Sequence, residues 1–436
     1  MTGVTPGRAA AYAVRIETER GRRLDRAFSA VADTLEPRER AFAHELAYGT
    51  TRLRARIDGL IAPHLSRPLV DVDSPVLELL RIGTYQIHYM DSVPAYAAVS
   101  ATVDQAREEV GRRPTGFVNA ILRKVALDPP QPPARIDSVE ALSGWGSHPE
   151  WLVRRWLSRY TADQVRRLVE HDNRRPSTCL VPLGMASDDA RAVLATHGIE
   201  AEFAAGWSPC LRLAGGTSVA DALRVLPASI VQDPASNLVV RYADVSSGTI
   251  VADLCAAPGG KSLALSDRAA RIIAADRSES RIRMVKDNAL RTGRRLDLVV
   301  ADAVRPPLNT VDAVLLDAPC TGTGTLARHP DARWRLTPEA IGEMAVLQAR
   351  MLDAAAELVR PGGLLVYSTC TLEPEENEER VTEFLRAHGD FALEPSDAVD
   401  RRDADQGFVD SAGYLRVEPW RSGYDGSFAA RLRKAA

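Results

Sequence analysis

The sequence predicts a doubly wound α/β domain at the C-terminal end of the chain, preceded by a small α+β module and an all-helical bundle. Three observations support this fold class. Short apolar runs alternate with helical segments beyond about residue 229. Apolar residues recur at helical spacing in the first part of the chain. A chain of 436 residues is also too long for one compact core. We place the boundaries at 1–128 for the bundle, 129–143 for a linker, 144–228 for the α+β module and 229–436 for the α/β domain.

The first 128 residues are expected to form helices only. Pro37 stands where a proline is tolerated in a first helical turn, and apolar residues then recur every three or four positions. Ser74 and Pro75 give a second start signal, a capping residue followed by proline. Two more helices are expected at 95–110 and 117–125. Together these segments predict a compact helical bundle.

A stiff proline-rich linker follows the bundle, with the sequence Asp-Pro-Pro-Gln-Pro-Pro-Ala at residues 128–134. Beyond it, strand-like and helix-like pieces alternate without a long period. Strands are expected from Cys179, at 199–203 and at 211–213, and helices at 187–197 and 219–226. This mixture predicts a small α+β module.

The last two hundred residues show the most regular pattern. Five apolar runs are expected to be strands of one sheet: 250–254, 272–275, 298–301, 311–316 and 364–367. Helical segments lie between them, which is typical of parallel strands joined by crossovers, and ligands bind at the carboxyl ends of such strands. Residues 414–417 and 428–432, on either side of a Gly-Tyr-Asp-Gly turn, predict a hairpin.

Composition narrows the class of protein. The chain is 45% hydrophobic and 26% charged, as in soluble globular proteins, and no apolar run approaches a membrane span. The N-terminus lacks the apolar stretch of a secretory signal. Five scattered cysteines suggest no disulfide framework, which fits a reducing, cytoplasmic location. The net charge of −3 argues neither for nor against nucleic acid as a partner. We expect no membrane contact and no obligate protein partner.

The first motif with a chemical meaning is the segment Val251–Ser262. A strand leads into a loop of small residues, which consists of Cys255, Ala256, Ala257, Pro258, Gly259, Gly260 and Lys261. The glycines allow close approach to the backbone, and a following helix N-terminus favours a carboxylate. The P-loop pattern fails because it requires glycine where Cys255 stands, and Rossmann spacing is absent. A ligand with a carboxylate and no phosphate fits better, and S-adenosylmethionine is such a ligand. Few lysines occur in this arginine-rich chain, so Lys261 suggests a need for a compact ammonium.

Two more carboxylates are expected around the same pocket. Asp276 ends the second strand, 23 residues after Asp253, where a carboxylate commonly binds ribose hydroxyls. Asp302 ends the third strand and could accept a hydrogen bond from an adenine amine. Each alone is as consistent with a solvated strand end, but with the first loop they predict three walls of a nucleoside pocket.

Two cysteines are expected at the ends of neighbouring strands. Asp317 and Cys320 follow the fourth strand in the string Asp-Ala-Pro-Cys-Thr-Gly-Thr-Gly, and Cys370 follows the fifth in Ser-Thr-Cys-Thr. Cys179 and Cys210 are interpreted as buried packing residues. Metal binding is disfavoured because no C-x-x-C pair and no suitably spaced histidine occur. Nucleophilic use suits Cys320 and Cys370 better: carbon 5 of cytosine attacks a sulfonium methyl only after a thiolate has added to carbon 6.

These strings resemble the signature motifs of RNA (cytosine-5) methyltransferases, which are Rossmann-like enzymes of the class I S-adenosylmethionine-dependent type. The resemblance implies that Cys370 is the nucleophile and that Cys320 assists product release; DNA methyltransferases attack instead from the Pro-Cys position. It also implies that residues 255–261, Asp276, Asp302 and Asp317 line the cofactor and base pocket.

The N-terminal part resembles a NusB-type RNA-binding domain, with Arg38-Glu-Arg-Ala-Phe, Leu-Ala-Tyr-Gly49 and Phe117-Val-Asn-Ala-Ile-Leu-Arg123. Its fusion to such a catalytic domain is similar to the Fmu/Sun-type, RsmB-like 16S ribosomal RNA methyltransferases. The resemblance implies 16S ribosomal RNA as substrate, naked or in an early assembly particle. A transfer RNA cytosine-5 methyltransferase remains an alternative, as does a non-catalytic NusB-like RNA-binding factor. Ser427 departs from the group, which usually carries a second aromatic residue there.

RNA contacts are expected in all three domains, because a target base must leave its stack to reach the crevice. Candidates for phosphate or stacking contacts are Arg174, Arg175, His329, Arg333 and Trp334. For each of them taken singly, a solvated surface position is an equally good interpretation.

Overall fold

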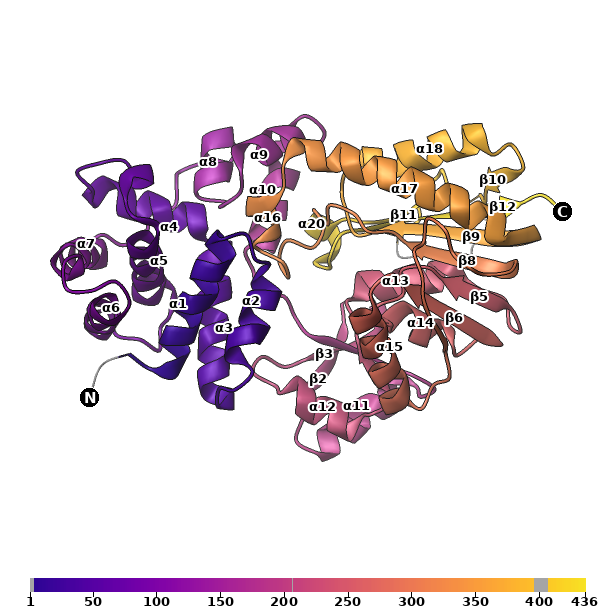
Figure 1. The fold of residues 1–436 in the computed structure, drawn as a ribbon, viewed down its shortest axis with the longest axis horizontal. Helices are drawn as coiled ribbons and strands as arrows, with labels where there is room; N and C mark the ends of the chain where they lie inside the picture. The colour runs from indigo at the N-terminus through magenta and orange to yellow at the C-terminus, as the bar shows by residue number, and fades with distance from the viewer. Residues whose placement is uncertain (1–3, 206, 396–406) are drawn as a thin grey trace. The chain divides into compact units, whose positions relative to one another are not determined.

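A computed structural model describes residues 4–205, 207–395 and 407–436, and the chain divides into two compact units (Figure 1). A helical unit comprises Met1–Arg175 and Leu326–Leu336. An α/β unit comprises Pro176–Thr325 and Thr337–Ala436. The helical unit therefore includes a short segment from the middle of the α/β sequence, which follows directly after the loop that carries Cys320.

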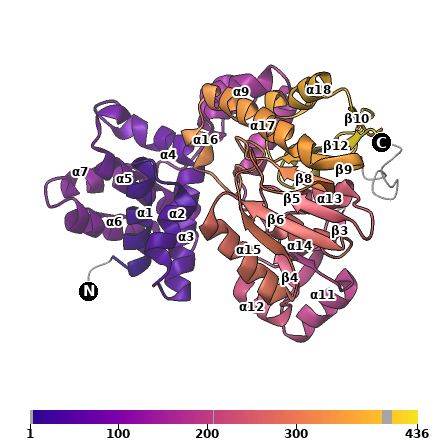
Figure 2. The same ribbon diagram turned by 45° about the vertical axis from the view of Figure 1, so that its right-hand side comes forward.

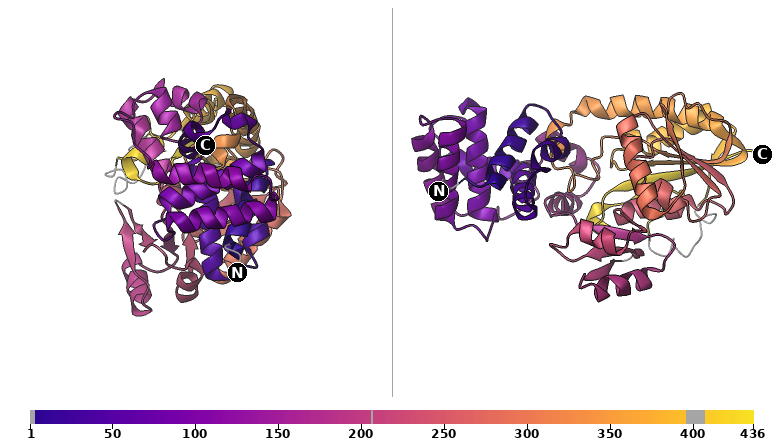
Figure 3. Two further views of the ribbon diagram at one scale, coloured as in Figure 1. Left: turned by 90° about the vertical axis from the view of Figure 1, so that its left-hand side faces the viewer. Right: turned by 60° about the horizontal axis from the view of Figure 1, so that its bottom comes forward.

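The first seven helices of the helical unit pack around one apolar core, and Figure 3 shows the unit from another side. The longer helices are α1 (Pro6–Glu19), α2 (Leu24–Ala32), α3 (Pro37–Arg52), α4 (Arg54–Ile61), α5 (Ser74–Tyr89), α6 (Ala95–Glu109) and α7 (Thr115–Leu127). Shorter ones are α8 (Val139–Gly144), α9 (Glu150–Leu157), α10 (Ala162–Asp172) and α16 (Ala332–Arg335). The expected helix starts at Pro37 and Ser74 are confirmed. The helical pattern after Pro37 is interrupted at Leu53, between α3 and α4.

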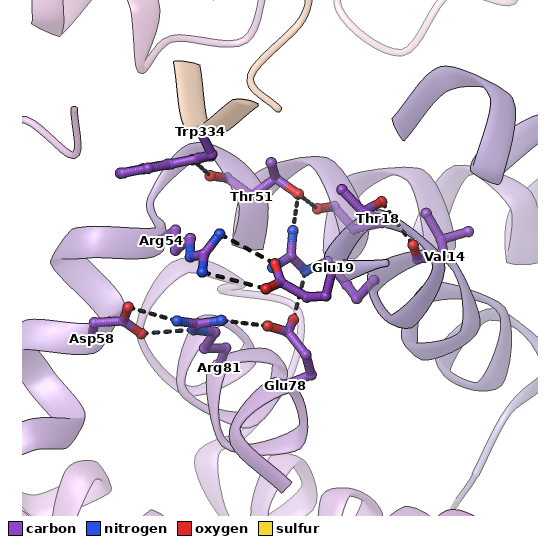
Figure 4. Close-up of polar contacts among 11 residues, drawn as sticks. Val14, Thr18, Glu19, Thr51, Arg54, Asp58, Glu78, Arg81 and Trp334 are labelled. Carbon is purple, nitrogen blue, oxygen red and sulfur yellow. Dashed lines mark hydrogen bonds and ion pairs between the residues drawn. The ribbon is translucent and has the colours of Figure 1, made fainter. Parts of the chain in front are cut away.

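A buried ion-pair network crosses this bundle (Figure 4). Glu78 of α5 is fully buried and accepts hydrogen bonds from Arg15 of α1, at 2.7 Å, and from Arg81. Arg81 also donates to both carboxylate oxygens of Asp58, at 2.7 and 2.8 Å. Burial alone would raise the pKa of Glu78, but the two guanidinium groups outweigh it and lower the pKa. Removing one member would leave buried charge without its partner, so the network fixes how α1, α4 and α5 pack.

The segment Leu326–Leu336 is held in the helical unit by Arg333. Its side chain is fully buried and donates to the carbonyls of Arg52, Ser147, Asp172 and Leu326 at 3.0 to 3.4 Å. It also donates to the side-chain oxygen of Asn173 at 2.9 Å. These acceptors come from four places in the chain, so one guanidinium joins them.

Trp334 also anchors the segment Leu326–Leu336 in the helical unit. Its indole N–H donates to the carbonyl of Thr51 at 2.9 Å, and the guanidinium of Arg54 lies 5.5 Å from the centre of its ring. The hydroxyl of Thr51 in turn accepts from Arg15, at 2.6 Å, so Trp334 lies at one end of the ion-pair network (Figure 4).

The α/β unit contains two sheets. The smaller is antiparallel and has the strand order β2-β3-β1-β4. Its strands are β1 (Cys179–Pro182), β2 (Ala201–Ala204), β3 (Trp207–Leu213) and β4 (Ser229–Val231). Helices α11 (Ser187–Thr196) and α12 (Val219–Val225) pack with it. The expected strands and helices of the α+β module are thus confirmed to within a few residues.

The larger sheet has the order β10-β12-β9-β8-β5-β6-β7, with β11 paired to β12. Its strands are β5 (Ile250–Asp253), β6 (Arg271–Asp276), β7 (Asp297–Val300), β8 (Val311–Asp317), β9 (Val359–Thr369), β10 (Phe391–Leu393), β11 (Leu415–Val417) and β12 (Ser427–Lys434). Strands β5 to β9 are parallel, and β12 pairs antiparallel with β9 and with β11. The five expected parallel strands and the hairpin are confirmed.

Helices cover both faces of this sheet, as Figures 1 and 2 show. Helices α17 (Pro338–Leu358) and α18 (Glu378–Ala387) lie on one face. Helices α13 (Pro234–Ala243), α14 (Gly260–Leu265) and α15 (Glu279–Thr292) lie on the other. This is a Rossmann-like arrangement, which brings the carboxyl ends of the parallel strands to one edge.

Candidate active site

The expected site residues follow the carboxyl ends of the parallel strands. Asp276 is the last residue of β6 and Asp317 the last of β8, while Cys370 directly follows β9. The loop 255–261 follows β5, and Asp302 comes two residues after β7. Because β5, β6, β8 and β9 run parallel, their ends meet at the same edge of the sheet.

Cys320 and Cys370 lie in contact. Their sulfur atoms are 3.4 Å apart, and the backbone N–H of Cys370 also points to the sulfur of Cys320 at 3.4 Å. Both side chains are partly exposed. The hydrogen bond with Cys370, burial and the nearby charge of Glu376 raise the pKa of Cys320 well above its ordinary value. Cys320 therefore stays a thiol at neutral pH.

Asp317 is held from two sides. Its Oδ2 atom accepts from the ammonium of Lys261 at 2.6 Å, and its Oδ1 atom accepts from the hydroxyl of Ser368 at 2.7 Å. Burial alone would lower the pKa of Lys261, but Asp317 outweighs it and raises the pKa. Lys261 is therefore charged and ties the loop after β5 to the end of β8.

The loop after β5 has little freedom. The amide of Ala256 donates to the carbonyl of Ala275 at 2.9 Å, and the side chain of Asn288 donates to the carbonyl of Pro258 at 3.0 Å. Gly259 has a φ of +104°, and a Cβ atom there would lie 3.1 Å from Val285. A glycine is thus required at this position. Burial raises the pKa of the Cys255 thiol, so this cysteine is unreactive packing inside the loop.

Asp253 lies beneath this loop and was not singled out from the sequence. It is 1% exposed, and its Oδ2 atom accepts from the hydroxyl of Ser262 at 2.6 Å. Burial raises its pKa to about 7. Its Oδ1 atom is buried with no hydrogen-bond partner among the described residues. Such an atom is costly unless a ligand donor satisfies it, and the ammonium of an amino-acid ligand is a suitable donor.

Asp276 and Asp302 differ in environment. Asp276 is 3% exposed and accepts from the amide of Ser278 at 3.0 Å, with the guanidinium of Arg281 at 3.6 Å from its second oxygen. Asp302 is exposed and accepts from the amide of Val304 at 2.9 Å. Asp276 is thus a buried carboxylate at a strand end, whereas Asp302 closes a surface turn.

The glycine-rich loop after Cys320 packs against the turn before β12. The amide of Gly324 donates to the carbonyl of Cys370 at 3.1 Å, and the amide of Gly426 donates to the carbonyl of Gly324 at 2.7 Å. A Cβ atom on Gly324 would lie only 2.7 Å from the Cα atom of Gly426. Ser427 is nearly buried, and its hydroxyl donates to the carbonyl of Thr369 at 3.2 Å. A serine instead of the aromatic residue expected at this position therefore changes the packing behind Cys370.

The expected RNA contacts are corrected at one position. Arg333 is fully buried and bonded to five acceptors, so neither an RNA contact nor a solvated surface position describes it. Burial lowers its pKa to about 10. Arg174, Arg175 and His329 are exposed, and Arg175 lies beside the carboxylate of Glu45. The prediction for Arg333 was wrong because its partners come from distant segments.

Among residues 4–205, 207–395 and 407–436, no group of three or more His, Cys, Asp or Glu side chains could hold a metal ion. Within the same ranges, every helix is too short or too polar to cross a lipid bilayer.

Three family models match successive parts of the chain. The model described as NusB family matches residues 9–127, and that of the RsmF/B-like methyltransferase ferredoxin-like domain matches residues 148–220. The model described as 16S rRNA methyltransferase RsmB/F matches residues 242–433.

Full-length relatives give the same picture. The chain is 32% identical to the ribosomal RNA small subunit methyltransferase B of Vibrio cholerae, over 89% of this chain and 91% of that protein. It is 31% identical to the protein of the same name from Salmonella typhi, over 98% and 97% of the two chains. A crystal structure of a protein named PH0851 covers 99% of both chains with a TM-score of 0.78 and 26% identity.

Proposed function

The chain belongs to the RsmB/F family of 16S rRNA methyltransferases, and from that premise we propose that it methylates carbon 5 of a cytosine in 16S ribosomal RNA. It is an S-adenosylmethionine-dependent methyltransferase with a NusB-type helical domain. The observation that carries the proposal is the pair of cysteine sulfurs 3.4 Å apart at the ends of β8 and β9. Two thiols in contact suit a reaction in which one adds to the base and the other serves its release.

The reaction divides between the two thiols. Cys370 adds as thiolate to carbon 6 of the cytosine, which makes carbon 5 nucleophilic enough to take a methyl group. S-adenosylmethionine, when bound, supplies that methyl group as an electrophile. The proton on carbon 5 is then taken up by a base, the bond between carbon 6 and Cys370 breaks with Cys370 leaving as a thiolate, and the aromatic ring is restored. Cys320, whose sulfur lies 3.4 Å from that of Cys370, is assigned to assist this release step.

The carboxylates and Lys261 orient the two substrates. We assign Asp253 and the loop 255–261 to the methionine part of the cofactor, because the unpaired Oδ1 of Asp253 can accept from its ammonium. Asp276 is assigned to the ribose hydroxyls and Asp302 to the adenine. Asp317, held by Lys261 and Ser368, is assigned to the cytosine ring.

The helical domain is proposed to supply affinity for RNA. We propose four segments: the helical RNA-binding domain at 1–128, the linker at 129–143, the α+β module at 144–228 and the catalytic domain at 229–436. The substrate would be ribosomal RNA, naked or in an early assembly particle, in the cytoplasm. A flipped, unpaired cytosine is the expected target, because carbon 6 is inaccessible in a stacked helix.

Two alternative functions, a transfer RNA methyltransferase and a non-catalytic RNA-binding factor, can be distinguished from the proposed one. A transfer RNA methyltransferase would use the same cysteines, and the NusB-type domain favours ribosomal RNA over it. A non-catalytic RNA-binding factor would not need the buried carboxylate of Asp253 or the paired thiols of Cys320 and Cys370. Calorimetry would detect no binding of S-adenosylmethionine to such a factor.

The proposal is tested by bisulfite sequencing of RNA from cells with and without the gene. We expect one 5-methylcytosine in 16S ribosomal RNA to disappear on deletion and to return with the wild-type protein but not with Cys370→Ala. Loss of a methylcytosine in transfer RNA alone would contradict the ribosomal assignment. An unchanged methylation map would contradict the activity.

A further inference from the structure

Glu376 occupies a fully buried position behind the two cysteine loops and takes no part in the reaction described above. It ends a short 3-10 turn (Pro374–Glu376) that follows β9. The hydroxyl of Tyr367, also fully buried, donates to the backbone carbonyl of Glu376 at 2.6 Å and holds the turn against the strand. A fully buried carboxylate is rare unless its oxygens are satisfied, so its partners define what it does.

The carboxylate of Glu376 contacts the residues that follow each cysteine. Its Oε2 atom accepts from the backbone amide of Thr321 at 2.9 Å, and its Oε1 atom accepts from the hydroxyl of Thr321. The hydroxyl of Thr371 lies 3.2 Å from the same Oε1 atom and 2.8 Å from the hydroxyl of Thr321. One side chain thus joins the residue after Cys320 to the residue after Cys370.

Gln348 of α17 extends this link to the other side of Cys320. Its amide nitrogen donates to Oε2 of Glu376 at 2.9 Å and to the carbonyl of Pro319 at 2.9 Å. Gln348 is fully buried. Pro319 and Thr321 flank Cys320, so the backbone on both sides of this cysteine is fixed by the Glu376–Gln348 pair. Because all four contacts present donors to the carboxylate, an ionised, acceptor-only Glu376 satisfies every partner.

We propose that Glu376 is a positioning residue that holds Cys320 in register with Cys370, so that the release thiol reaches the base to which Cys370 is bonded. The inference rests on the proposed covalent mechanism. Glu376 touches neither thiol nor substrate; it acts through the backbone of Thr321 and the hydroxyl of Thr371. Displacement of one reacting group by about 1 Å can lower a rate a hundredfold, so the geometry that Glu376 fixes bears directly on turnover.

The test compares Glu376→Ala, Glu376→Gln and a matched control, Glu379→Gln, which changes an exposed glutamate three residues away. Glutamine can place its carbonyl oxygen toward the Thr321 amide and Gln348, while its amide donates to the two hydroxyls. We therefore expect Glu376→Gln to rescue most of the function that Glu376→Ala loses.

Three quantities are measured on each full-length variant: S-adenosylmethionine affinity by calorimetry, kcat on RNA, and the fraction of enzyme bonded to RNA on a denaturing gel. For Glu376→Ala we expect unchanged cofactor affinity, kcat lowered about tenfold to a hundredfold, and more trapped RNA adduct than in wild type. Glu376→Gln should lie close to wild type in all three, and Glu379→Gln should be indistinguishable from it.

A folded Glu376→Ala that binds cofactor, turns over at the wild-type rate and traps no extra RNA would overturn the inference. If Glu376→Ala fails to bind cofactor, Thr371→Val, which removes one hydroxyl and little volume, replaces it. A lowered kcat with more adduct would then support the inference, and wild-type values would overturn it. Failure of the covalent mechanism itself would appear separately, as an absence of adduct in Cys320→Ala.

Discussion

The sulfur atoms of Cys320 and Cys370 lie 3.4 Å apart, although 50 residues separate them in the chain. They meet because β8 and β9 are neighbouring parallel strands and each cysteine follows its strand at the same edge. The backbone amide of Cys370 also points to the sulfur of Cys320 at 3.4 Å. Two sulfurs in contact suit the proposed division of attack and release between Cys370 and Cys320.

Asp276→Ala should weaken S-adenosylmethionine binding by about 1–3 kcal/mol, the usual scale for loss of one partner of a buried polar contact. Asp276 is 3% exposed at the end of β6, where ribose hydroxyls are expected. Calorimetry gives the affinity, and Asp287→Ala, at an exposed position of α15, is the control. If the folded Asp276 variant bound cofactor as wild type does, Asp276 would lie outside the site.

Asp253 should make the stability of the cofactor-free protein depend on pH. Its pKa is raised to about 7, against about 3.9 for an unfolded aspartate, so the folded chain binds this proton more tightly. Its contribution to stability is full below pH about 4 and is lost as the pH rises through about 7. Asp253→Asn, which stays neutral, should gain roughly 2–3 kcal/mol relative to wild type between pH 5 and pH 8.

Chemical denaturation of both proteins at the two pH values, without cofactor, measures this gain. The hydrogen bond from Ser262, which an asparagine changes, gives an offset that is the same at both pH values. A constant difference between the variant and wild type would therefore show that Asp253 titrates normally.

Arg333→Ala should destabilise the helical unit by about 3–5 kcal/mol, because it leaves several buried acceptors without a donor. Hydrogen exchange should report faster exchange in the segments around Arg52, Ser147 and Asp172. Arg335→Ala, two residues away, removes only one ion pair, with Asp331, and should destabilise the unit less. Equal effects of the two substitutions would contradict the structural role given to Arg333.

The sequence was informative where a local pattern determines the structure. The apolar runs that become β5 to β9 each end near a chemically useful residue, and the parallel-sheet rule then brings Asp276, Asp317 and Cys370 to one edge. The helix starts at Pro37 and Ser74 could likewise be predicted, because the residues that signal a helix start lie within a few positions of each start.

The residues whose roles could not be predicted from the sequence depend on distant partners. Arg333 carries a charge that normally indicates surface, and its acceptors are brought together only by the fold. Glu376 stands in an acidic run, and its main partner Thr321 is 55 residues away. Asp253 is a strand-end carboxylate whose burial depends on the loop that covers it. None of these contacts leaves a periodic or local pattern in the sequence.

The roles of the two cysteines are tested by incubating Cys320→Ala and Cys370→Ala with RNA and S-adenosylmethionine and examining each variant on a denaturing gel. Cys320→Ala should attack and methylate once and then remain bonded to RNA through Cys370, as a slowly migrating protein–RNA species. Cys370→Ala should neither methylate RNA nor form the adduct. An adduct in Cys370→Ala instead would reverse the two roles, and two active variants without any adduct would contradict the covalent mechanism.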